Sequence, residues 1–361
     1  MQASIAAVAA WIAAALLGPG AALAQGAYRL ESAVALKSAA PDWDYLSFEP
    51  SRAYLFIGRR ADGVTVYDTR AHRVVRGIAD SRDANAAVLV GAFDRGYTVN
   101  GDGTSTVFRL STLQTLGRIK IGDDADNAFY EPVTQQLAFM MGDSQQIAFV
   151  DARTGTLNGR LKTDSHKLDG AAPDGEGGLY VAERDRNAVL HVDARTRRVA
   201  AEWPISGCEQ PTGLAFDRAH NRLLVGCRGK TPVLAVMDAD NGTVITTLEI
   251  GRGNDGVVYD PATRRVYTSN GVDANLVVYQ QVDRDTYKLV AAVTTRPYAR
   301  TMAYDAAGKK IYMVTAEGIA DPAMQIKKDV ASFYPNRYFP NTFTVLTYAP
   351  VGGRRTTRNL P

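Results

Sequence analysis

A short apolar motif recurs along this chain at a nearly constant interval, and that interval limits what the chain can fold into. Six copies are VTVYD (64–68), TVFRL (106–110), IAFVD (147–151), LHVDA (190–194), LAVMD (234–238) and LVVYQ (276–280). The polar residues that close them are 41 to 45 residues apart, and a seventh copy, FTVLT, ends at Thr347 after a longer gap. A constant period of this length is typical of repeat proteins, in which each repeat is one supersecondary unit.

A second alignment shows what one repeat contains. One stretch aligns without gaps at seven places, for example NDGVVYDPATRRVYTSN (254–270) and PTGLAFDRAHNRLLVGC (211–227). Each copy is predicted to contain an apolar strand, a polar turn and a second apolar strand. The recurring motif supplies a third strand and the segment after it a fourth, so each repeat has four strands. Since no stretch shows the periodicity of an amphipathic helix, the sequence predicts an all-β, seven-bladed β-propeller with four strands in each blade.

The two ends of the repeat region complement one another. The N-terminal stretch YRLESAVAL (28–36) resembles YKLVAAVTT (287–295), the outer strand before the last repeat, whereas the last repeat stops after FTVLTYA without an outer strand. We therefore expect the N-terminal strand to complete the last blade, because an open ring would leave strand edges free to aggregate. This predicts a single domain over residues 25–350, with a long connection at 316–341 and a solvated tail at 351–361.

The repeat pattern resembles that of a bacterial family. Stretches such as QPTGLAFDRAHNRLLVG (210–226) and DADNGTVITTLEIGRG (238–253) look like the YVTN-repeat, YncE-like proteins, and the resemblance extends over essentially the whole mature chain. The resemblance implies the propeller fold, related to the WD40-like propellers. It does not imply one function, because propellers host many unrelated activities on one scaffold.

The N-terminus has the features of an export signal. An uncharged apolar run from Ile5 to Leu17 is followed by Ala22-Leu23-Ala24, a small-x-small pattern typical of signal-peptidase cleavage. We interpret residues 1–24 as a signal peptide, since the run is too short and interrupted for a membrane anchor, and no cysteine follows that would carry a lipid. This predicts a periplasmic or secreted protein with no membrane span.

One position of the repeat places polar side chains at one mouth of the channel. The residues that open the innermost strands are Asp44, Asn85, Asp126, Asp169, Thr212, Asp255 and Arg300. We expect Arg300 to neutralise Asp255 and Asp44 in the neighbouring blades, which would leave the charge of Asp126 and Asp169 uncompensated. A hard cation such as Ca²⁺, or the cationic or hydroxyl-rich part of a ligand, would then bind at Asp126 and Asp169. The alternative is that Asp and Asn occupy these positions because they hydrogen-bond a nearby turn.

The position 15 residues later returns to the same face of the ring. It holds Arg59, Asn100, Met141, Arg184, Cys227, Asn270 and Thr315. We include Arg59, Arg184 and Asn270 among the candidate ligand-binding residues, because the arginines could bind an anion or pair with the carboxylates. Cys227 has one possible partner, Cys208, and two cysteines in an exported protein are expected to form a disulfide; metal ligation and free thiols are the alternatives.

The long connection at 316–341 starts on the same face. It carries one methionine with several aromatic and basic residues, namely Met324, Lys327, Lys328, Phe333, Tyr334, Arg337, Tyr338 and Phe339. A connection of this length without regular structure is usually functional or disordered. Two interpretations stand side by side: a lid over the mouth, or a flap packed on its own blade.

The sequence favours a binding protein over an enzyme. The motifs of common hydrolases and nucleotide-binding proteins do not occur in a suitable context. Lys and Arg number 41 against 38 Asp and Glu, a net charge of +3, so bulk electrostatics do not suggest duplex DNA. We expect a monomer that binds a small polar molecule or a protein at the channel mouth. One alternative is a metal-dependent lactonase, since seven-bladed lactonases resemble this architecture. The other alternative is a protein that binds single-stranded nucleic acid.

Overall fold

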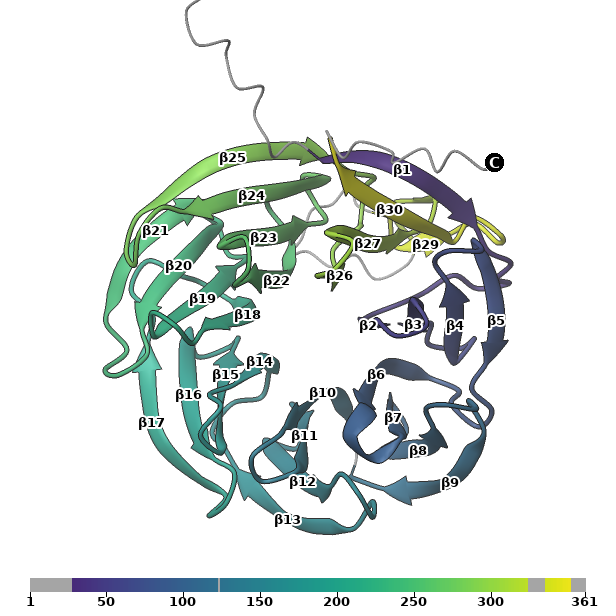
Figure 1. Ribbon diagram of the computed structural model, residues 1–361, viewed down its shortest axis with the longest axis horizontal. Coiled ribbons are helices and arrows are strands. Elements are labelled where there is room, and N and C mark those ends of the chain that lie inside the picture. Colours follow the sequence, from purple (N-terminus) through teal and green to yellow (C-terminus); the bar gives the residue numbers. More distant parts are fainter. Residues whose placement is uncertain (1–27, 123, 324–334, 352–361) are drawn as a thin grey trace, which may run out of the picture.

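The computed structural model describes residues 28–122, 124–323 and 335–351, which form seven four-stranded antiparallel sheets arranged around a central channel (Figure 1). This arrangement confirms the predicted seven-bladed propeller. In six blades the strands run from the channel outward in chain order. They are β2 (Leu46–Glu49), β3 (Tyr54–Gly58), β4 (Val64–Asp68) and β5 (Arg73–Gly77); β6 (Ala84–Val90), β7 (Arg95–Asn100), β8 (Thr104–Arg109) and β9 (Thr115–Lys120); β10 (Ala125–Glu131), β11 (Gln136–Met141), β12 (Gln146–Asp151) and β13 (Leu157–Lys162); β14 (Leu168–Pro173), β15 (Gly178–Glu183), β16 (Ala188–Asp193) and β17 (Arg198–Pro204); β18 (Pro211–Asp217), β19 (Arg222–Cys227), β20 (Val233–Asp238) and β21 (Val244–Glu249); and β22 (Asn254–Asp260), β23 (Arg265–Asn270), β24 (Asn275–Gln281) and β25 (Tyr287–Thr294). A short 3₁₀ turn, η1 (Gly91–Phe93), joins β6 to β7.

The seventh blade joins the two ends of the chain. Its order is β26 (Met302–Asp305), β27 (Lys310–Thr315), β30 (Thr344–Pro350) and β1 (Tyr28–Ala35). Strand β1 pairs antiparallel with β30 along its length, and the backbone N–H of Leu36 donates to the carbonyl of Phe343 at 2.7 Å. The predicted closure by the N-terminal strand is therefore confirmed, and Figure 1 shows β1 beside β30 at the junction with blade one.

Burial follows the position of each strand in its blade. The second strand β11 is buried throughout, the outermost strand β5 is exposed throughout, and β13 alternates between partly buried and exposed residues. Continuous apolar runs suit strands that are covered on both faces, so the second and third strands supply most of the packing between blades. One such contact is the stacking of Phe56 in blade one on Phe108 in blade two, with ring centroids 5.8 Å apart.

The aspartates that close the recurring motif make turns. The carboxylate of Asp68 accepts the backbone N–H groups of Arg70 and Ala71, each at 2.9 Å, and Asp151 and Asp193 make the same pattern two and three residues on. Such Asx turns fix the reversal between the third and fourth strands. This explains why aspartate recurs at the end of the motif.

Blade five contains the disulfide. Cys208 and Cys227 are bonded, with their Cα atoms 5.4 Å apart. Cys227 ends β19 opposite Pro211 at the start of β18, so the bond connects the loop entering the blade to its second strand. This confirms the predicted pairing. Among the described residues, no helix is long and apolar enough to cross a membrane.

Deletion of residues 28–36 should expose the backbone edge of β30 and destabilise the ring, because that edge would lose its hydrogen-bonding partner. We expect loss of the cooperative thermal transition or aggregation in size-exclusion chromatography. A chain that begins at residue 28, and so keeps strand β1, serves as the control and should behave like the mature protein. Equal melting of the two truncated proteins would contradict the closure.

Replacement of both Cys208 and Cys227 by serine should lower the free energy of unfolding by about 3 kcal/mol, the value expected for a loop of this length. The separation of the two cysteines is 19 residues. Urea denaturation of parent and variant measures the change, and thiol titration of the denatured, unreduced parent should detect no free thiol. Two titratable thiols would show that the bond does not form.

Candidate functional site

The predicted ring residues lie at one end of the innermost strands. Asn85, Asp126, Asp169, Thr212 and Asp255 are each the second residue of an inner strand, in blades two to six. In each of these blades the pairing of the first two strands shifts register at that point, as between Ala125 and Asn127 in blade three. A β-bulge adds a residue, bends the strand and redirects its side chain. The bulge therefore places the ring side chain at the channel mouth in five successive blades.

Arginines pair with the carboxylates on one side of the ring. Arg300, only 8% exposed, donates through Nε to Asp255 at 2.8 Å and through Nη2 to Asp44 at 3.3 Å. Arg60 donates to the second oxygen of Asp44 at 2.6 Å, and Arg228 to the second oxygen of Asp255 at 3.2 Å. Arg300 thus lies between the two acids that the sequence placed beside it. Each of these two carboxylates has two guanidinium partners.

The carboxylates on the other side lack such partners. Among the described residues, no Lys or Arg nitrogen lies within ion-pairing distance of Asp126 or Asp169. The hydroxyl of Tyr45 crosses the channel from blade one and donates to Asp169 at 2.8 Å. The side-chain N–H of Asn85 donates to the carbonyl of Ala125 at 3.1 Å and lies 3.4 Å from Asp126. The side-chain oxygen of Asn85 is buried without a partner in the described structure.

Burial shifts the protonation of both carboxylates. Burial, and next the charge of Asp255, raise the pKa of Asp169 to about 6, while Arg184 opposes the rise. Burial and the charge of Asp169 also raise the pKa of Asp126, and Arg60 and Lys167 oppose that rise. Burial also raises the pKa of the arginine-paired Asp44, to about 7, so the raised pKa values report burial on both sides of the ring. What Asp126 and Asp169 lack is the direct contact with an arginine.

The mouth carries more positive charge than the aligned ring positions predict. Arg60 and Arg228 directly follow Arg59 and Cys227, which occupy the repeat position 15 residues after the ring residue. Neither arginine stands at an aligned position, so the repeat alignment did not identify them as partners of the carboxylates. With Arg184 and Lys167 near the other two acids, the mouth as a whole is close to charge balance. What distinguishes the two sides is direct pairing and not total charge.

The hydrogen bonds of the ring carboxylates argue against a local turn role. Those found for Asp44, Asp126, Asp169 and Asp255 connect to side chains on other segments. By contrast, the motif-closing Asp68 accepts backbone N–H groups of its own turn. The two kinds of aspartate are therefore different in function within the fold, although the sequence alone presents both as repeat-position acids.

Two of the other candidate residues are buried and bonded within the fold. Arg59 is 5% exposed, packs its guanidinium over the Phe343 ring at 4.5 Å and donates to the carbonyl of Lys37. Asn270 is fully buried and bonds Asn254 and Asn275 within blade six. Strand alternation explains this outcome, because a residue at the end of the second strand can point into the blade as readily as toward the channel. Arg184 lies close enough to Asp169 to oppose the rise of its pKa.

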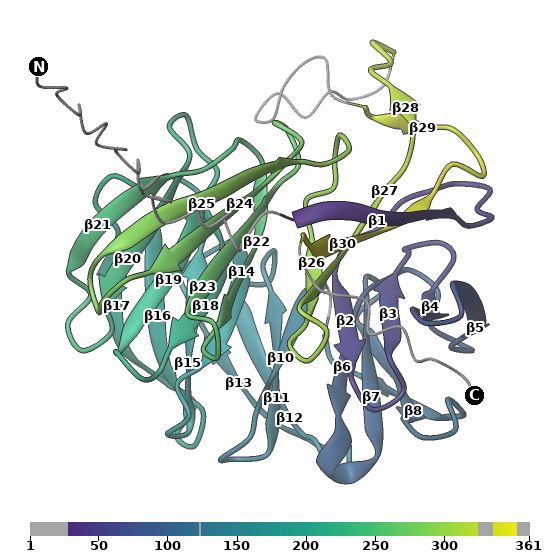
Figure 2. The ribbon, with the colours of Figure 1, turned by 45° about the horizontal axis from the view of Figure 1, so that its top comes forward.

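The described part of the long connection packs on the ring. Strands β28 (Gly318–Ile319) and β29 (Arg337–Tyr338) form a small hairpin that projects beyond β27 (Figure 2). The ring of Tyr338 lies 5.1 Å from that of Trp43 and 5.5 Å from that of Tyr298. This contact fits the interpretation of a flap packed on its own blade and the adjoining edge of blade one. Met324, Lys327, Lys328, Phe333 and Tyr334 lie outside the described residues.

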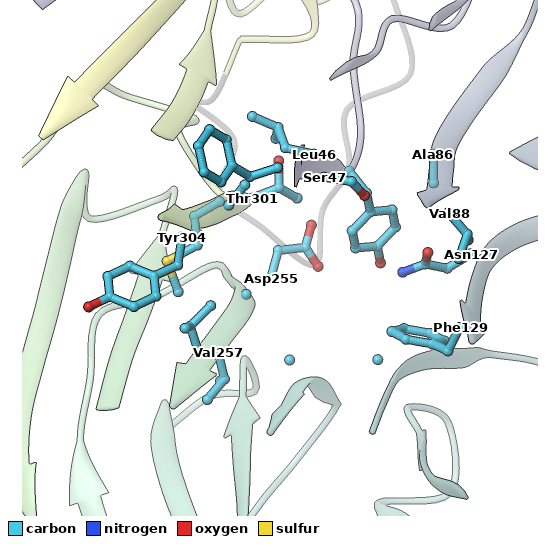
Figure 3. Close-up of a pocket in the computed structure, with 18 of the residues that line it drawn as sticks. Leu46, Ser47, Ala86, Val88, Asn127, Phe129, Asp255, Val257, Thr301 and Tyr304 are labelled. Atoms are coloured by element: carbon cyan, nitrogen blue, oxygen red, sulfur yellow. The ribbon is translucent and has the colours of Figure 1, made fainter. Parts of the chain in front are cut away.

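A cavity of about 560 Å³ occupies the channel beside the ring. Its lining comes from the innermost strands, and Figure 3 shows Asp255, Asn127, Val257 and Phe129 around a common opening. Residues that follow two ring acids, Asn127 after Asp126 and Gly170 after Asp169, line its wall. The ring and the channel are therefore neighbouring parts of one site.

The described residues contain no group of three or more His, Cys, Asp or Glu side chains placed to hold a metal ion. Ca²⁺ takes six to eight oxygen ligands, and the arginines already pair with Asp44 and Asp255. Asp126, Asp169 and Asn85 are therefore the ring residues left to supply oxygen ligands, and a cation at these residues stays a prediction.

Comparison with known proteins supports the fold only. No family model matches the chain, and no curated protein matches it. A chain from the crystal structure of the mitotic checkpoint complex has a TM-score of 0.69 at 12% identity, with 97% of this chain and 98% of that chain covered. The RRP9 WD40 repeats give a TM-score of 0.72 at 8% identity, covering 89% of this chain and 100% of that one.

A third similar structure is the hydrazine synthase of Kuenenia stuttgartiensis, with a TM-score of 0.66 at 16% identity, covering 77% of this chain and 94% of that chain. At such identities the similarity shows a shared propeller architecture and carries no activity. The chain therefore has the fold of WD40-repeat propellers. The resemblance to the YVTN-repeat, YncE-like proteins stays a prediction.

Asp169→Asn should change how stability depends on pH. A carboxyl whose pKa rises from 3.8 to about 6 on folding stabilises the folded state fully below pH 4, and that stabilisation is lost as pH rises to 6. At 1.36 kcal/mol per pKa unit, the loss amounts to about 3 kcal/mol. Urea denaturation between pH 4 and 7 should show the variant gaining that much relative to the parent, while exposed Asp240→Asn shows no such trend. A difference independent of pH would contradict the shift.

Proposed function

We propose that this protein is an exported β-propeller that binds a small polar ligand at the channel mouth, with the ligand's cationic or hydroxyl group held by Asp126 and Asp169. The observation that carries the proposal is the uneven pairing of the ring. Arginines pair with Asp44 and Asp255, whereas the other two carboxylates have no such partner among the described residues. A cationic group that bound there would compensate charge that burial otherwise disfavours.

Export is supported by two independent features. The N-terminal 24 residues have the pattern of a cleaved signal peptide, and Cys208 and Cys227 form a disulfide. Disulfides persist in the periplasm and outside the cell and are rare in the cytosol. We therefore place the protein in the periplasm or in the secreted fraction.

A protein partner is a second kind of occupant for the same face. A partner that inserted a basic side chain would satisfy the same two carboxylates. One of the similar structures belongs to a multiprotein assembly, the mitotic checkpoint complex, which shows that such scaffolds take part in assemblies. We retain the expectation of a monomer in the absence of such a partner.

Two alternatives have less support than binding. A metal-dependent lactonase would need a metal held by the ring acids, and the described residues offer no group of three suitable ligands. Single-strand nucleic-acid binding would need exposed aromatic platforms in a basic groove, but Tyr338 of the flap packs against Trp43 and Tyr298.

The double variant Asp126→Asn with Asp169→Asn should lose binding. Ethanolamine, which carries both an ammonium and a hydroxyl group, is a suitable probe, compared with NaCl at equal ionic strength. We expect ethanolamine to raise the melting temperature of the parent and to leave that of the double variant unchanged. Without ligand, the double variant should be as stable as the parent or more stable, because like-charge repulsion is relieved.

The matched control is Glu176→Gln with Asp240→Asn, which removes the same charge at exposed positions and should keep the response. An equal response of the ring variant and the parent would contradict the proposed site. A ring variant that melts clearly lower with and without ethanolamine would show that these acids serve the fold alone.

A further inference from the structure

We infer that the ligand is an organic ammonium compound with an apolar body, whose ammonium group binds at Asp126 and Asp169 and whose body enters the central channel. This inference rests on the proposed function and adds to it the chemical class of the ligand. It follows from three features of the described residues: the position of the cavity, the chemistry of its wall and the acceptors at its polar end.

The cavity adjoins the ring, and its lining includes Asp255 and the residues that follow Asp126 and Asp169. Asn127 and Gly170 line it and directly follow Asp126 and Asp169 in the chain. Tyr45 lines it as well, and its hydroxyl bonds Asp169. A molecule anchored at the carboxylates therefore has its nearest enclosed space in the channel. The volume of about 560 Å³ lies within the range of sites for small organic molecules.

The channel wall offers an apolar surface to the body of a ligand. Half-buried residues on it include Phe48, Val88, Phe129, Val258 and Tyr304, contributed by five blades. Figure 3 shows Val88, Phe129 and Tyr304 among the residues that surround the opening. Burial of an alkyl or aromatic group against such side chains is favourable in proportion to the area removed from water.

The hydroxyl groups on the same wall are already used within the protein. Ser47 donates to the carbonyl of Ala87 at 2.6 Å, Thr212 to that of Asn254 at 2.9 Å, and Thr301 to that of Asp44 at 2.6 Å. A hydroxyl-rich ligand body, such as a sugar, would find the donors of these three hydroxyl groups already engaged and would give up hydrogen bonds to water on entering. The wall therefore favours an apolar body over a polar one.

The polar end offers acceptors that suit an ammonium group. Asn85 is 2% exposed, lies against Asp126, and its side-chain oxygen has no hydrogen-bond partner in the described structure. An unpaired buried polar atom is costly, and a ligand that supplies the missing donor removes that cost. A primary ammonium carries three N–H donors and no acceptor. The carboxylates of Asp126 and Asp169 and the amide oxygen of Asn85 are three acceptor groups for those three donors.

A ladder of straight-chain amines tests the inference. Titration calorimetry at pH 7.5 with butyl-, pentyl-, hexyl- and heptylammonium should show affinity rising about fourfold per methylene, which corresponds to about 0.8 kcal/mol for each buried CH₂. Hexanol and hexanesulfonate have the same chain without the cation and should bind at least tenfold more weakly than hexylammonium.

A variant that fills the channel separates the body from the ammonium group. Val88→Phe should weaken the binding of hexylammonium at least tenfold and leave the thermal shift produced by ethanolamine unchanged, while Val133→Phe, at an exposed position, should change neither. If Val88→Phe does not fold, Phe129→Leu provides the second test. A wider channel should accept longer alkyl chains, so the chain length that gives the tightest binding should be greater than in the parent.

The outcomes distinguish the inference from the proposed function. Binding that depends on Asp126 and Asp169 but not on chain length would overturn the inference and leave the mouth site intact. Binding of hexanol or hexanesulfonate as tight as that of hexylammonium would also overturn it, since the ammonium would then contribute nothing. Failure of every ammonium probe to bind, with no effect of the double variant, would overturn both.

Discussion

The junction between blade seven and blade one is the constraint on which the ring depends, because it is where the two ends of the chain must meet. At the outer edge β1 pairs with β30. At the inner edge Arg300 donates to the carbonyl of Trp43 at 2.8 Å and to Asp44, and Thr301 donates to the carbonyl of Asp44. The charge of the buried guanidinium is compensated by Asp44 and Asp255, although its Nη1 has no hydrogen-bond partner in the described structure.

The same junction organises the channel mouth. Because Arg300 also pairs with Asp255 in blade six, it neutralises the acids on both sides of its own blade. The ring acids farther from the junction, Asp126 and Asp169, receive no such partner among the described residues. Closure of the fold and asymmetry of the candidate site therefore have a common cause.

The repeated β-bulge explains why a site exists at all. An inner strand without a bulge would alternate its side chains regularly between the two faces of its blade. The shift in register at the second residue redirects one side chain in each of blades two to six. Below this polar ring the hydroxyl groups of Ser47, Thr212 and Thr301 donate to backbone carbonyls, and apolar side chains lie among them on the channel wall. A charged mouth above an apolar channel is a combination that suits an amphipathic ligand.

The sequence by itself determined the number of blades, the four strands in each, the closure by residues 28–36, the disulfide and the positions of the ring residues. These properties depend on periodicity and on alignment of the repeats, which local patterns preserve. It also placed Arg300 between Asp255 and Asp44, since neighbouring repeats must be neighbouring blades.

Only the tertiary structure decided which polar residues meet at the mouth. Tyr45 bonds Asp169 across 124 residues of sequence, and Arg228 reaches Asp255 from the next blade, while Arg59 turns away toward Phe343. Strand alternation and the bulges change the direction of a side chain with a shift of one residue. Pairing across the channel depends on the closed ring, so no pattern within a single repeat could reveal it.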